Sequence, residues 1–400
     1  MELNQVYSGF KLISKNIIEE SASETLEFIH LKSGARLFYL KRDDDNKVFS
    51  ISFKTTPADD MGIPHIVEHS TLCGSRKFPL KEPFVELAKG SLNTFLNAMT
   101  FPDKTMYPVA SCNDKDFHNL IDVYLDAVFY PNIYSDKNIL RQEGWHFELE
   151  NEEAPLEYSG VVFNEMKGAL SSPEDLLENE IMRTLFPDNT YRYESGGNPA
   201  AIPGLTQEEF ENFHRKFYHP SNSYIFFYGK LDIEEQLAFL NNEYLSSFDK
   251  IYVDSYIPMQ SSFKEIKRIE SFYPIGKDES PEGKSFLNYS FVVNRVLDNT
   301  DRIGLSVLVQ ALLLSEASPF RKIIIDSKLG KDFSASFEDA VLQPYISLTA
   351  LNANREDGGR YLSFIMDTAR KLADNGIDRN LLEAALNVLE FRIREADFNQ

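Results

Sequence analysis

Hydrophobic and polar residues alternate in three short runs near the start of the chain, at residues 26–31, 35–40 and 48–54, with polar turns between them. Alternation with a period of two places every second side chain on the same face of a strand. We therefore expect three short strands at the edge of an antiparallel sheet. A fourth apolar run, at residues 223–228, predicts a further strand.

Helical spacing appears from Asp114 onward, where apolar residues recur every three or four positions. Asp114 is placed to cap the first turn of this helix. Similar patterns predict helices at residues 158–170, 206–217 and 233–245. Because strands and helices mix without a regular β-α-β order, the sequence predicts the α+β class.

The length of 400 residues exceeds what one hydrophobic core usually organises, so we expect two domains. Residues 1–248 would form the first domain, and the polar, Pro- and Ser-containing residues 249–283 a linker. Residues 284–400 would form a second domain of the same α+β kind. The second domain shows strand patterns at 286–293 and on both sides of Gln343 and Pro344, a helical pattern at 302–314, and two helical patterns after Glu356. The sequence stops inside a helical pattern, so we expect the second domain to be incomplete and the chain to be one part of a longer polypeptide.

The net negative charge of the chain disfavours some classes of binding partner and favours others. The chain has 41 Lys and Arg against 62 Asp and Glu, a net charge of −21, which argues against a nucleic-acid partner and favours a cationic one. Solubility alone is an alternative reason for such acidity. The two cysteines, Cys73 and Cys112, are too few for a disulfide framework. Without a signal-peptide pattern or a run of about 20 apolar residues, we expect a cytoplasmic protein that does not enter a membrane.

One short segment carries the residue types of a metal site. Pro64 precedes His65-Ile66-Val67-Glu68-His69, and proline is tolerated in the first turn of a helix. On a helix, His65 and His69 share a face, so both imidazoles can reach one ion, with Glu68 beside it. Zinc accepts imidazole nitrogen and carboxylate oxygen and can keep one position open for water. A surface helix with two ordinary histidines is the alternative.

A catalytic zinc commonly has three protein ligands, so a third must lie elsewhere. Glu165 is the best candidate, because on the predicted helix it shares an apolar stripe with Tyr158, Val161, Val162 and Ala169. An unpartnered carboxylate on such a stripe would be costly, and a metal would remove that cost. The spacing leaves other candidates open: Glu82, Glu86, Glu143 and His146. The alternative is that Glu165 forms an ion pair with a purely structural role.

Three other features of the sequence could be taken for functional sites, but we do not assign them a function. Cys73 lies four positions after His69, but we interpret it as a packed residue. Trp145 and His146 are interpreted as core or lining residues. The segment SGGN, residues 195–198, lacks the Lys-Ser/Thr pair of a phosphate-binding loop.

The longer sequence around these residues resembles a known family. It contains HIVEHSTLCGSRKFPLKEPFVELAKGSLNTFLNAMTFPDKTMYPVAS, DVYLDAVFYP, QEGWHFE, GVVFNEMKGAL, SGGNPAAIPGLT and FYHPSNS, in this order. This series resembles the presequence protease and falcilysin branch of the insulinase (pitrilysin) family of zinc metallopeptidases. The resemblance covers most of residues 20–245.

The resemblance implies roles for individual residues. It implies that His65, His69 and Glu165 bind one Zn²⁺ ion and that Glu68 is the catalytic base. It also implies that Leu96, Asn97, Ala98, Met99 and Thr100 form an edge strand to which a substrate peptide adds as an extra strand. An internal strand or a loop is the alternative for these five residues.

The resemblance further implies the architecture and activity of the whole enzyme. The fold would consist of repeated α+β domains, each an antiparallel sheet layered with helices, and residues 284–400 would be a catalytically inactive domain. This chain would be the first half of a clamshell endopeptidase that degrades unstructured peptides. The C-terminal half would be its partner and would supply an Arg and a Tyr that these 400 residues do not match. The alternatives are a peptide-binding relative that does not cleave, an isolated half without activity, and a purely structural zinc site.

Overall fold

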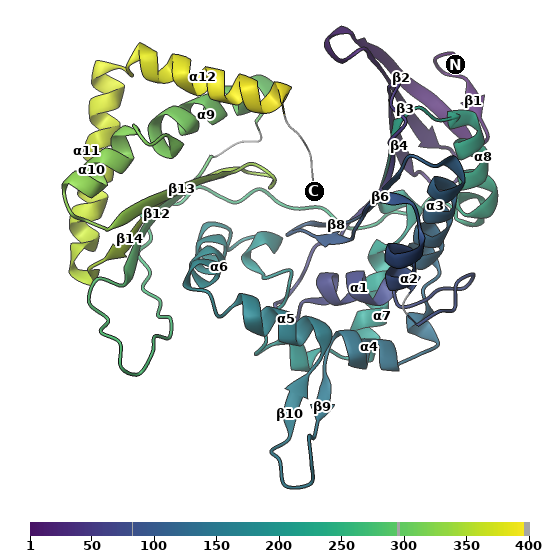
Figure 1. Cartoon of the computed structure of the whole chain (residues 1–400), viewed down its shortest axis with the longest axis horizontal. Helices are drawn as coiled ribbons and strands as arrows, with labels where there is room; N and C mark the ends of the chain where they lie inside the picture. Colours follow the sequence, from purple (N-terminus) through teal and green to yellow (C-terminus); the bar gives the residue numbers. More distant parts are fainter. Residues whose placement is uncertain (82, 294–296, 396–400) are drawn as a thin grey trace. The chain divides into compact units, whose positions relative to one another are not determined.

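The computed structural model describes residues 1–81, 83–293 and 297–395 (Figure 1). Its internal contacts divide the chain into two compact units. The first unit contains Met1–Asn179 and Tyr193–Ile257, and the second contains Glu180–Arg192 and the chain from Pro258 onward. No sequence pattern indicated that Glu180–Arg192 packs with the second unit. The α+β class is confirmed.

A nine-stranded sheet forms the centre of the first unit, and β7 pairs with β8 beside the main path of strands. Along that path the strands are β1 (Val6–Tyr7), β2 (Phe10–Ile18), β3 (Ser23–His30), β4 (Arg36–Lys41), β11 (Ser223–Gly229), β5 (Lys47–Lys54), β8 (Lys104–Ser111) and β6 (Asn93–Leu96), with β7 at Met99–Thr100. The predicted strands near residues 26–54 and 223–228 are confirmed as β3, β4, β5 and β11.

The position of these strands in the sheet differs from the prediction. Strands β3, β4 and β5 lie inside the sheet and not at its edge, because β1 and β2 continue it on one side and β8 and β6 on the other. Strand β11 lies between β4 and β5, parallel to β4 and antiparallel to β5. The sheet is therefore mixed. Alternation along a strand identifies its buried face, but it says nothing about which strand becomes its neighbour.

Eight α-helices begin in the first unit within the described residues. They are α1 (Ile63–Thr71), α2 (Pro83–Gly90), α3 (Asp114–Phe129), α4 (Asn138–Glu143), α5 (Val161–Ala169), α6 (Pro173–Leu185), α7 (Gln207–Phe217) and α8 (Ile233–Glu243). Helix α6 continues from Glu180 into the second unit. The N-terminal cap of α3 is Asn113, one residue before the predicted Asp114, and its side chain accepts a hydrogen bond from the Asp116 N–H. Helix α7 begins with a capping box in which Thr206 and Glu209 bond each other's backbone N–H.

Aromatic side chains fill the core between the sheet and the helices. Fully buried members include Tyr39, Phe49, Phe53, Tyr107, Phe117 and Tyr124. Phe53 stacks on Tyr218 with ring centroids 4.7 Å apart, and it meets the edge of Phe129. These contacts join the sheet to α3 and to the end of α7, and α7 in turn packs against α1.

A buried histidine in this core predicts a loss of stability in acid. His214 donates from Nε2 to the Val128 carbonyl at 2.9 Å, and its Nδ1 accepts from the Tyr134 hydroxyl at 2.6 Å. Burial lowers the pKa of His214 from 6.5 to about 4. The neutral ring is therefore favoured in the folded state, and this contribution is complete above pH 6.5 and disappears as the pH falls towards 4.

We expect the free energy of unfolding to fall by about 3 kcal/mol through this group between pH 6.5 and 4. Denaturant unfolding at several pH values would measure it, with His214→Gln as the variant that lacks the titrating ring. Identical pH dependence in the two proteins would contradict the assignment.

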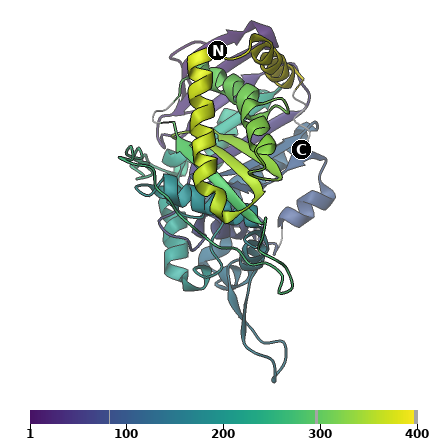
Figure 2. The same cartoon turned by 90° about the vertical axis from the view of Figure 1, so that its left-hand side faces the viewer.

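The second unit has its own sheet and its own core. Strands β12 (Ser285–Val292), β14 (Tyr345–Ala353) and β13 (Asp332–Glu338) form a three-stranded antiparallel sheet in this order. Its helices are α9 (Asn299–Val309) with a π-helical continuation at Gln310–Leu314, α10 (Pro319–Asp326), α11 (Gly358–Asn375) and α12 (Arg379–Arg394). Figures 1 and 2 show these helices on one face of the sheet. Residues 249–284 contain no helix or strand.

One stretch of the second unit, Asn299–Asp326, is long and apolar enough to cross a membrane by length and composition alone. This finding differs from the expectation that no stretch of the sequence approaches a membrane span. The helix is interrupted between Leu314 and Pro319, and Val309, Leu313 and Phe320 belong to the core of the second unit. The stretch is therefore weak evidence for a membrane span.

Candidate metal centre

Helix α1 places His65 and His69 at one end of a cavity in the first unit. The helix begins after Gly62, which has a φ of +69°, and Pro64 lies in its first turn as predicted. A Cβ at Gly62 would lie 2.7 Å from the Gly196 carbonyl oxygen, so only glycine allows the loop at residues 195–197 to approach here. This close approach brings the Gly196 carbonyl to His65.

Three side chains converge in front of this helix. Among the described residues, His65, His69 and Glu165 form a group whose potential ligand atoms all lie within 4.8 Å of one another. Oε2 of Glu165, on α5, lies 3.7 Å from Nε2 of His65 and 3.7 Å from Nε2 of His69. Ligands of a tetrahedral zinc with bonds of about 2.0 Å are separated by about 3.3 Å. The donor set therefore fits zinc in both chemistry and spacing.

The remaining ring nitrogens are oriented by outer partners. Nδ1 of His65 donates to the Gly196 carbonyl at 3.1 Å, and Nδ1 of His69 lies 3.4 Å from Oε2 of Glu143. When Nδ1 carries the proton, the lone pair lies on Nε2, which is the atom that faces the third side chain in both rings. The sequence indicates neither partner in this role, since its spacing offers Glu143 only as another candidate ligand.

Hydrogen bonds favour the ionised form of the Glu143 carboxylate, which can accept a hydrogen bond from Nδ1 of His69. Burial would raise the pKa of the Glu143 carboxyl, but hydrogen bonds from His69, Gln142 and Cys73 outweigh burial and lower it. Burial likewise would lower the pKa of His69, and the bond to Glu143 together with nearby carboxylates raises it. Cys73 contacts Oε1 of Glu143 at 3.4 Å, consistent with its interpretation as a packed residue.

Glu68 lies beside the convergent group but is not part of it. Its side chain is buried, and Oε2 accepts a hydrogen bond from the Thr100 hydroxyl at 2.9 Å. Burial raises the pKa of Glu68 above its usual value, against the opposing effect of His69 and His65. A carboxylate with a raised pKa therefore lies next to the potential ligand atoms. A raised pKa suits a group that accepts a proton and later returns it.

The environment of Glu165 differs from the prediction. Helix α5 starts at Val161, and Tyr158 belongs to the preceding strand, so the expected apolar stripe does not form. The buried residues of α5 are Val162, Phe163 and Met166, while the Glu165 side chain is 53% exposed. Glu165 faces an open cavity, so the predicted cost of burying its carboxylate does not arise. Its position opposite the two imidazoles is what makes it a candidate ligand.

The convergent group lies in a cavity of about 480 Å³ within the first unit. The lining residues are His65, Glu68, His69, Ala98, Met99, Thr100, Phe101, Glu165, Met166, Glu194, Ser195 and Gly196. Sequence reasoning missed Glu194, a partly buried carboxylate whose pKa is raised by desolvation and whose Oε1 accepts from the Gly196 N–H at 2.9 Å. It fixes the loop whose carbonyl meets His65.

The predicted edge strand forms two pieces, and only its residues Ala98, Met99 and Thr100 line this cavity. Leu96 ends β6, Met99 and Thr100 form β7, and both strands pair with β8. Asn97 and Ala98 interrupt the strand, since the Ala98 N–H bonds to the Asn97 side chain at 3.0 Å. Strand β6 is the last strand on its side of the sheet.

The other candidate ligands do not join the group. Glu86 is exposed on α2, and Nδ1 of His146 contacts the Arg141 carbonyl. Glu82 lies outside the described residues. Trp145 packs against the core of the first unit and donates to the Leu205 carbonyl, in agreement with its interpretation as a core or lining residue.

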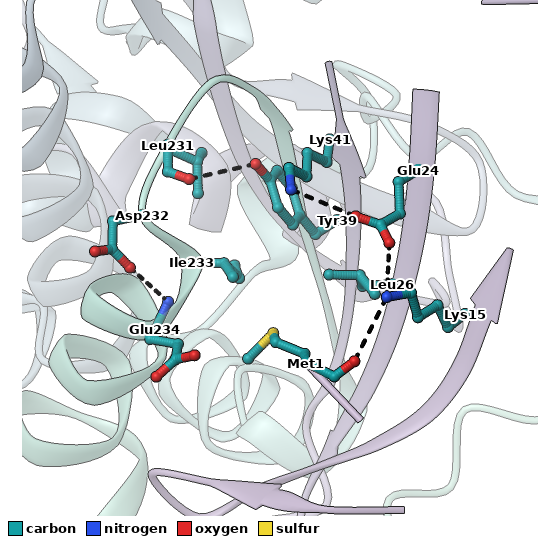
Figure 3. A pocket seen from close by; sticks show the side chains of 10 residues that line it. All are labelled: Met1, Lys15, Glu24, Leu26, Tyr39, Lys41, Leu231, Asp232, Ile233 and Glu234. Carbon is teal, nitrogen blue, oxygen red and sulfur yellow. Dashed lines mark hydrogen bonds and ion pairs between the residues drawn. The ribbon is translucent and has the colours of Figure 1, made fainter. Parts of the chain in front are cut away.

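A second cavity of the first unit, of about 230 Å³, offers different chemistry (Figure 3). Three of its charged residues pair with one another, since Glu24 contacts Lys15 at 2.8 Å and Lys41 at 3.4 Å, and Asp232 accepts hydrogen bonds from the Glu234 and Glu235 N–H groups at the start of α8. The Tyr39 hydroxyl donates to the Leu231 carbonyl. This cavity contains no histidine, and we do not assign it a metal.

Comparisons with known proteins find similar sequences and structures. Protein HypA of Clostridium perfringens is 49% identical over 395 residues, which cover 99% of this chain and 41% of that protein. Presequence protease 1 of Arabidopsis thaliana, described as chloroplastic/mitochondrial, is 46% identical over 97% of this chain and 36% of its own length. The sequence model described as "Peptidase M16 inactive domain" matches residues 204–389.

The chain belongs to the M16 peptidase family. Its fold is that of M16 peptidases: the crystal structure of pitrilysin superimposes with a TM-score of 0.65 at 17% identity, covering 98% of this chain and 41% of pitrilysin. The chain spans less than half the length of the curated M16 relatives named above. Residues 204–389 include none of His65, Glu68, His69 and Glu165, so the "inactive domain" description applies to another part of the chain.

The contact between Glu143 and His69 makes a testable prediction for zinc affinity. Replacing Glu143 by Gln removes the ionised acceptor that holds the ring orientation, and outer partners of metal ligands typically affect affinity by about 10- to 100-fold. We expect a loss of this size in the zinc affinity of Glu143→Gln, measured by competition with a chromogenic chelator. Glu86→Gln, an exposed change of the same kind, is the control. Equal affinity in both variants would contradict a positioning role for Glu143.

Proposed function

We propose that this chain holds a catalytic zinc ion and forms the first half of an M16 endopeptidase that hydrolyses unstructured peptides. His65, His69 and Glu165 would hold the ion, and Glu68 would be the catalytic base. The observation that carries the proposal is the convergence of three ligand atoms within 4.8 Å beside a buried carboxylate in a cavity.

The chemistry follows from what each side chain can do. When bound, zinc supplies a Lewis acid that polarises a carbonyl and lowers the pKa of water towards about 7. Glu68 would take the proton from the attacking water and later return it to the leaving amine. The Thr100 hydroxyl, 2.9 Å from Oε2 of Glu68, would keep the carboxylate aimed at the water. Gly196 and Glu143 would hold the two imidazoles in place.

The edge strand offers a way to bind many different peptides. We infer that the peptide backbone adds alongside β6 and β7, next to the ligand atoms. Backbone N–H and C=O groups are present in every peptide, so strand addition selects extended chains with little regard to side chains. The hydrogen bond from Thr100 to Glu68 connects this edge with the proposed base. Broad specificity for unstructured peptides would follow.

Two other functions remain as explicit alternatives. A relative that binds peptides without cleaving them would keep the edge strand but would not need Glu68 next to three ligands. A structural zinc site usually has four protein ligands, whereas this group has three and opens to a cavity. We further propose that the remainder of a longer protein supplies groups that complete the site, and that the protein acts in the cytoplasm without membrane or nucleic-acid partners.

Metal dependence of cleavage tests the proposal. We expect the full-length protein to cleave an unstructured peptide, to lose this activity in a chelator and to recover it when zinc is restored. The 400-residue chain should bind zinc under the same conditions and cleave slowly or not at all. Stoichiometric zinc in a full-length protein that leaves the peptide intact would contradict the proposed enzyme and favour the binding alternative.

A further inference from the structure

A short hairpin extends from the body of the first unit (Figures 1 and 2). Strands β9 (His146–Glu148) and β10 (Glu157–Ser159) pair only with each other, in antiparallel register. The hairpin connects α4, which carries Glu143, to α5, which carries Glu165. Neither face of the hairpin is therefore covered by a second sheet.

One face of the hairpin is apolar and exposed to solvent. Phe147 and Tyr158 are direct cross-strand partners, and their rings stack with centroids 5.1 Å apart. Leu149 and Leu156 follow at the next alternate position of each arm. The four side chains are 56%, 46%, 52% and 61% exposed in the order named. Four large apolar side chains on one short element are more typical of a contact surface than of a solvated loop.

The base of the hairpin holds this face in a fixed orientation. Trp145 contacts both Phe147 and Tyr158 edge to face, at 5.5 and 5.7 Å, and donates from Nε1 to the Leu205 carbonyl. At the same base, Gly160 packs so closely on Gly144 that an added Cβ would lie 2.2 Å from the Gly144 carbonyl oxygen. The apolar face is thus preformed, which lowers the entropy cost of binding a partner.

The other face and the tip are acidic. Glu148 and Glu157 are direct cross-strand partners, and Glu150, Glu152 and Glu153 lie in the turn. The sequence has no Lys or Arg between Arg141 and Lys167, and within the described part of the chain no ion pair involves these five glutamates. Like charges directly opposite each other destabilise a hairpin. The stability of the hairpin itself does not explain this arrangement.

We propose that the β9–β10 hairpin is a docking surface for a cationic, amphipathic peptide segment. Its apolar side chains would cover Phe147, Leu149, Leu156 and Tyr158, and its Lys or Arg side chains would meet the five glutamates. The unpaired acidic charge selects this occupant, because it repels nucleic acids, anionic membranes and the identical hairpin of a second copy. Docking requires no metal, so it can be tested apart from the proposed peptidase activity.

Binding of a designed peptide tests the proposal. The probe is a fluorescent 18-residue peptide of Leu and Lys only, arranged to form an amphipathic helix, and its anisotropy is measured with the 400-residue chain in the presence of a chelator. We expect Glu148→Gln/Glu157→Gln to weaken binding roughly tenfold, since two exposed charge pairs are lost. Leu149→Ser/Leu156→Ser should weaken it at least as much. Glu19→Gln/Glu20→Gln, which removes the same charge elsewhere on the first unit, should leave it unchanged.

Folding and binding effects can be separated. Glu148→Gln/Glu157→Gln removes a repulsive pair, so its thermal unfolding temperature should stay equal to that of the natural chain or rise while peptide binding weakens. A matching peptide with Glu in place of Lys should not bind. The proposal is overturned if the Lys peptide fails to bind the natural chain, if both hairpin variants bind it normally, or if they change only the oligomeric mass.

Discussion

Replacement of Glu68 by Gln in the full-length protein is expected to reduce peptide hydrolysis by about 10²- to 10⁴-fold while leaving zinc bound, because a general base typically contributes a factor of this size. Glu68 is not among the three convergent ligands, so its loss should not release the ion. Glutamine preserves the shape of the side chain and can still accept the Thr100 hydrogen bond, but it cannot take a proton.

Steady-state cleavage of an unstructured peptide and metal analysis of the same protein samples would measure both effects. Glu86→Gln, on the exposed surface of α2, is the matched control and should cleave normally. If Glu68→Gln hydrolyses the peptide at the natural rate, another group must move the proton. If it loses zinc, Glu68 is a ligand and the proposed division of roles is wrong.

Loss of a ligand is expected to have an equally large effect, but on a different quantity. In His65→Ala the ion keeps two of its three protein ligands, so we expect zinc affinity to fall by more than the roughly 10- to 100-fold typical of an outer partner. Zinc at a hundred times its dissociation constant stabilises the folded natural chain by about 2.7 kcal/mol. The variant should lose this zinc-dependent stabilisation.

Thermal or denaturant unfolding with and without zinc would measure this effect in the 400-residue chain. His146→Ala is the control, since His146 lies outside the convergent group and its Nδ1 contacts the Arg141 carbonyl. Equal stabilisation of His65→Ala and the natural chain by zinc would place the ion elsewhere. The same comparison for Glu165→Ala tests the third ligand independently of the motif on α1.

Local patterns predicted most of the elements because their causes are local. Strands β3, β4, β5 and β11 alternate, and the helices that follow Asn113 and Thr206 carry both periodicity and capping residues. The arrangement of the strands has no such local cause. Strand β11 lies between β4 and β5 although about 170 residues of chain separate it from them, and such pairing depends on packing of the whole first unit.

In the candidate site, too, some features follow from the local sequence and others depend on the whole fold. The spacing of His65 and His69 on a helix is a local property, and the structure places both rings as the spacing predicts. The apolar stripe that predicts Glu165 does not form, because a glycine and a strand end precede α5. Glu143 and the Gly196 carbonyl could not be identified as partners of the two rings, since their proximity depends on how α4 and the 195–197 loop meet α1.

In the proposed site, His65, His69 and Glu165 hold a zinc ion with an open position next to Glu68. Anomalous diffraction at the zinc absorption edge, from crystals of the chain grown with one equivalent of zinc, tests it most directly. We expect one strong peak at about 2.0–2.2 Å from Nε2 of both histidines and an oxygen of Glu165, with no fourth protein ligand. A peak at another site, or a closed shell of four protein ligands, would contradict it.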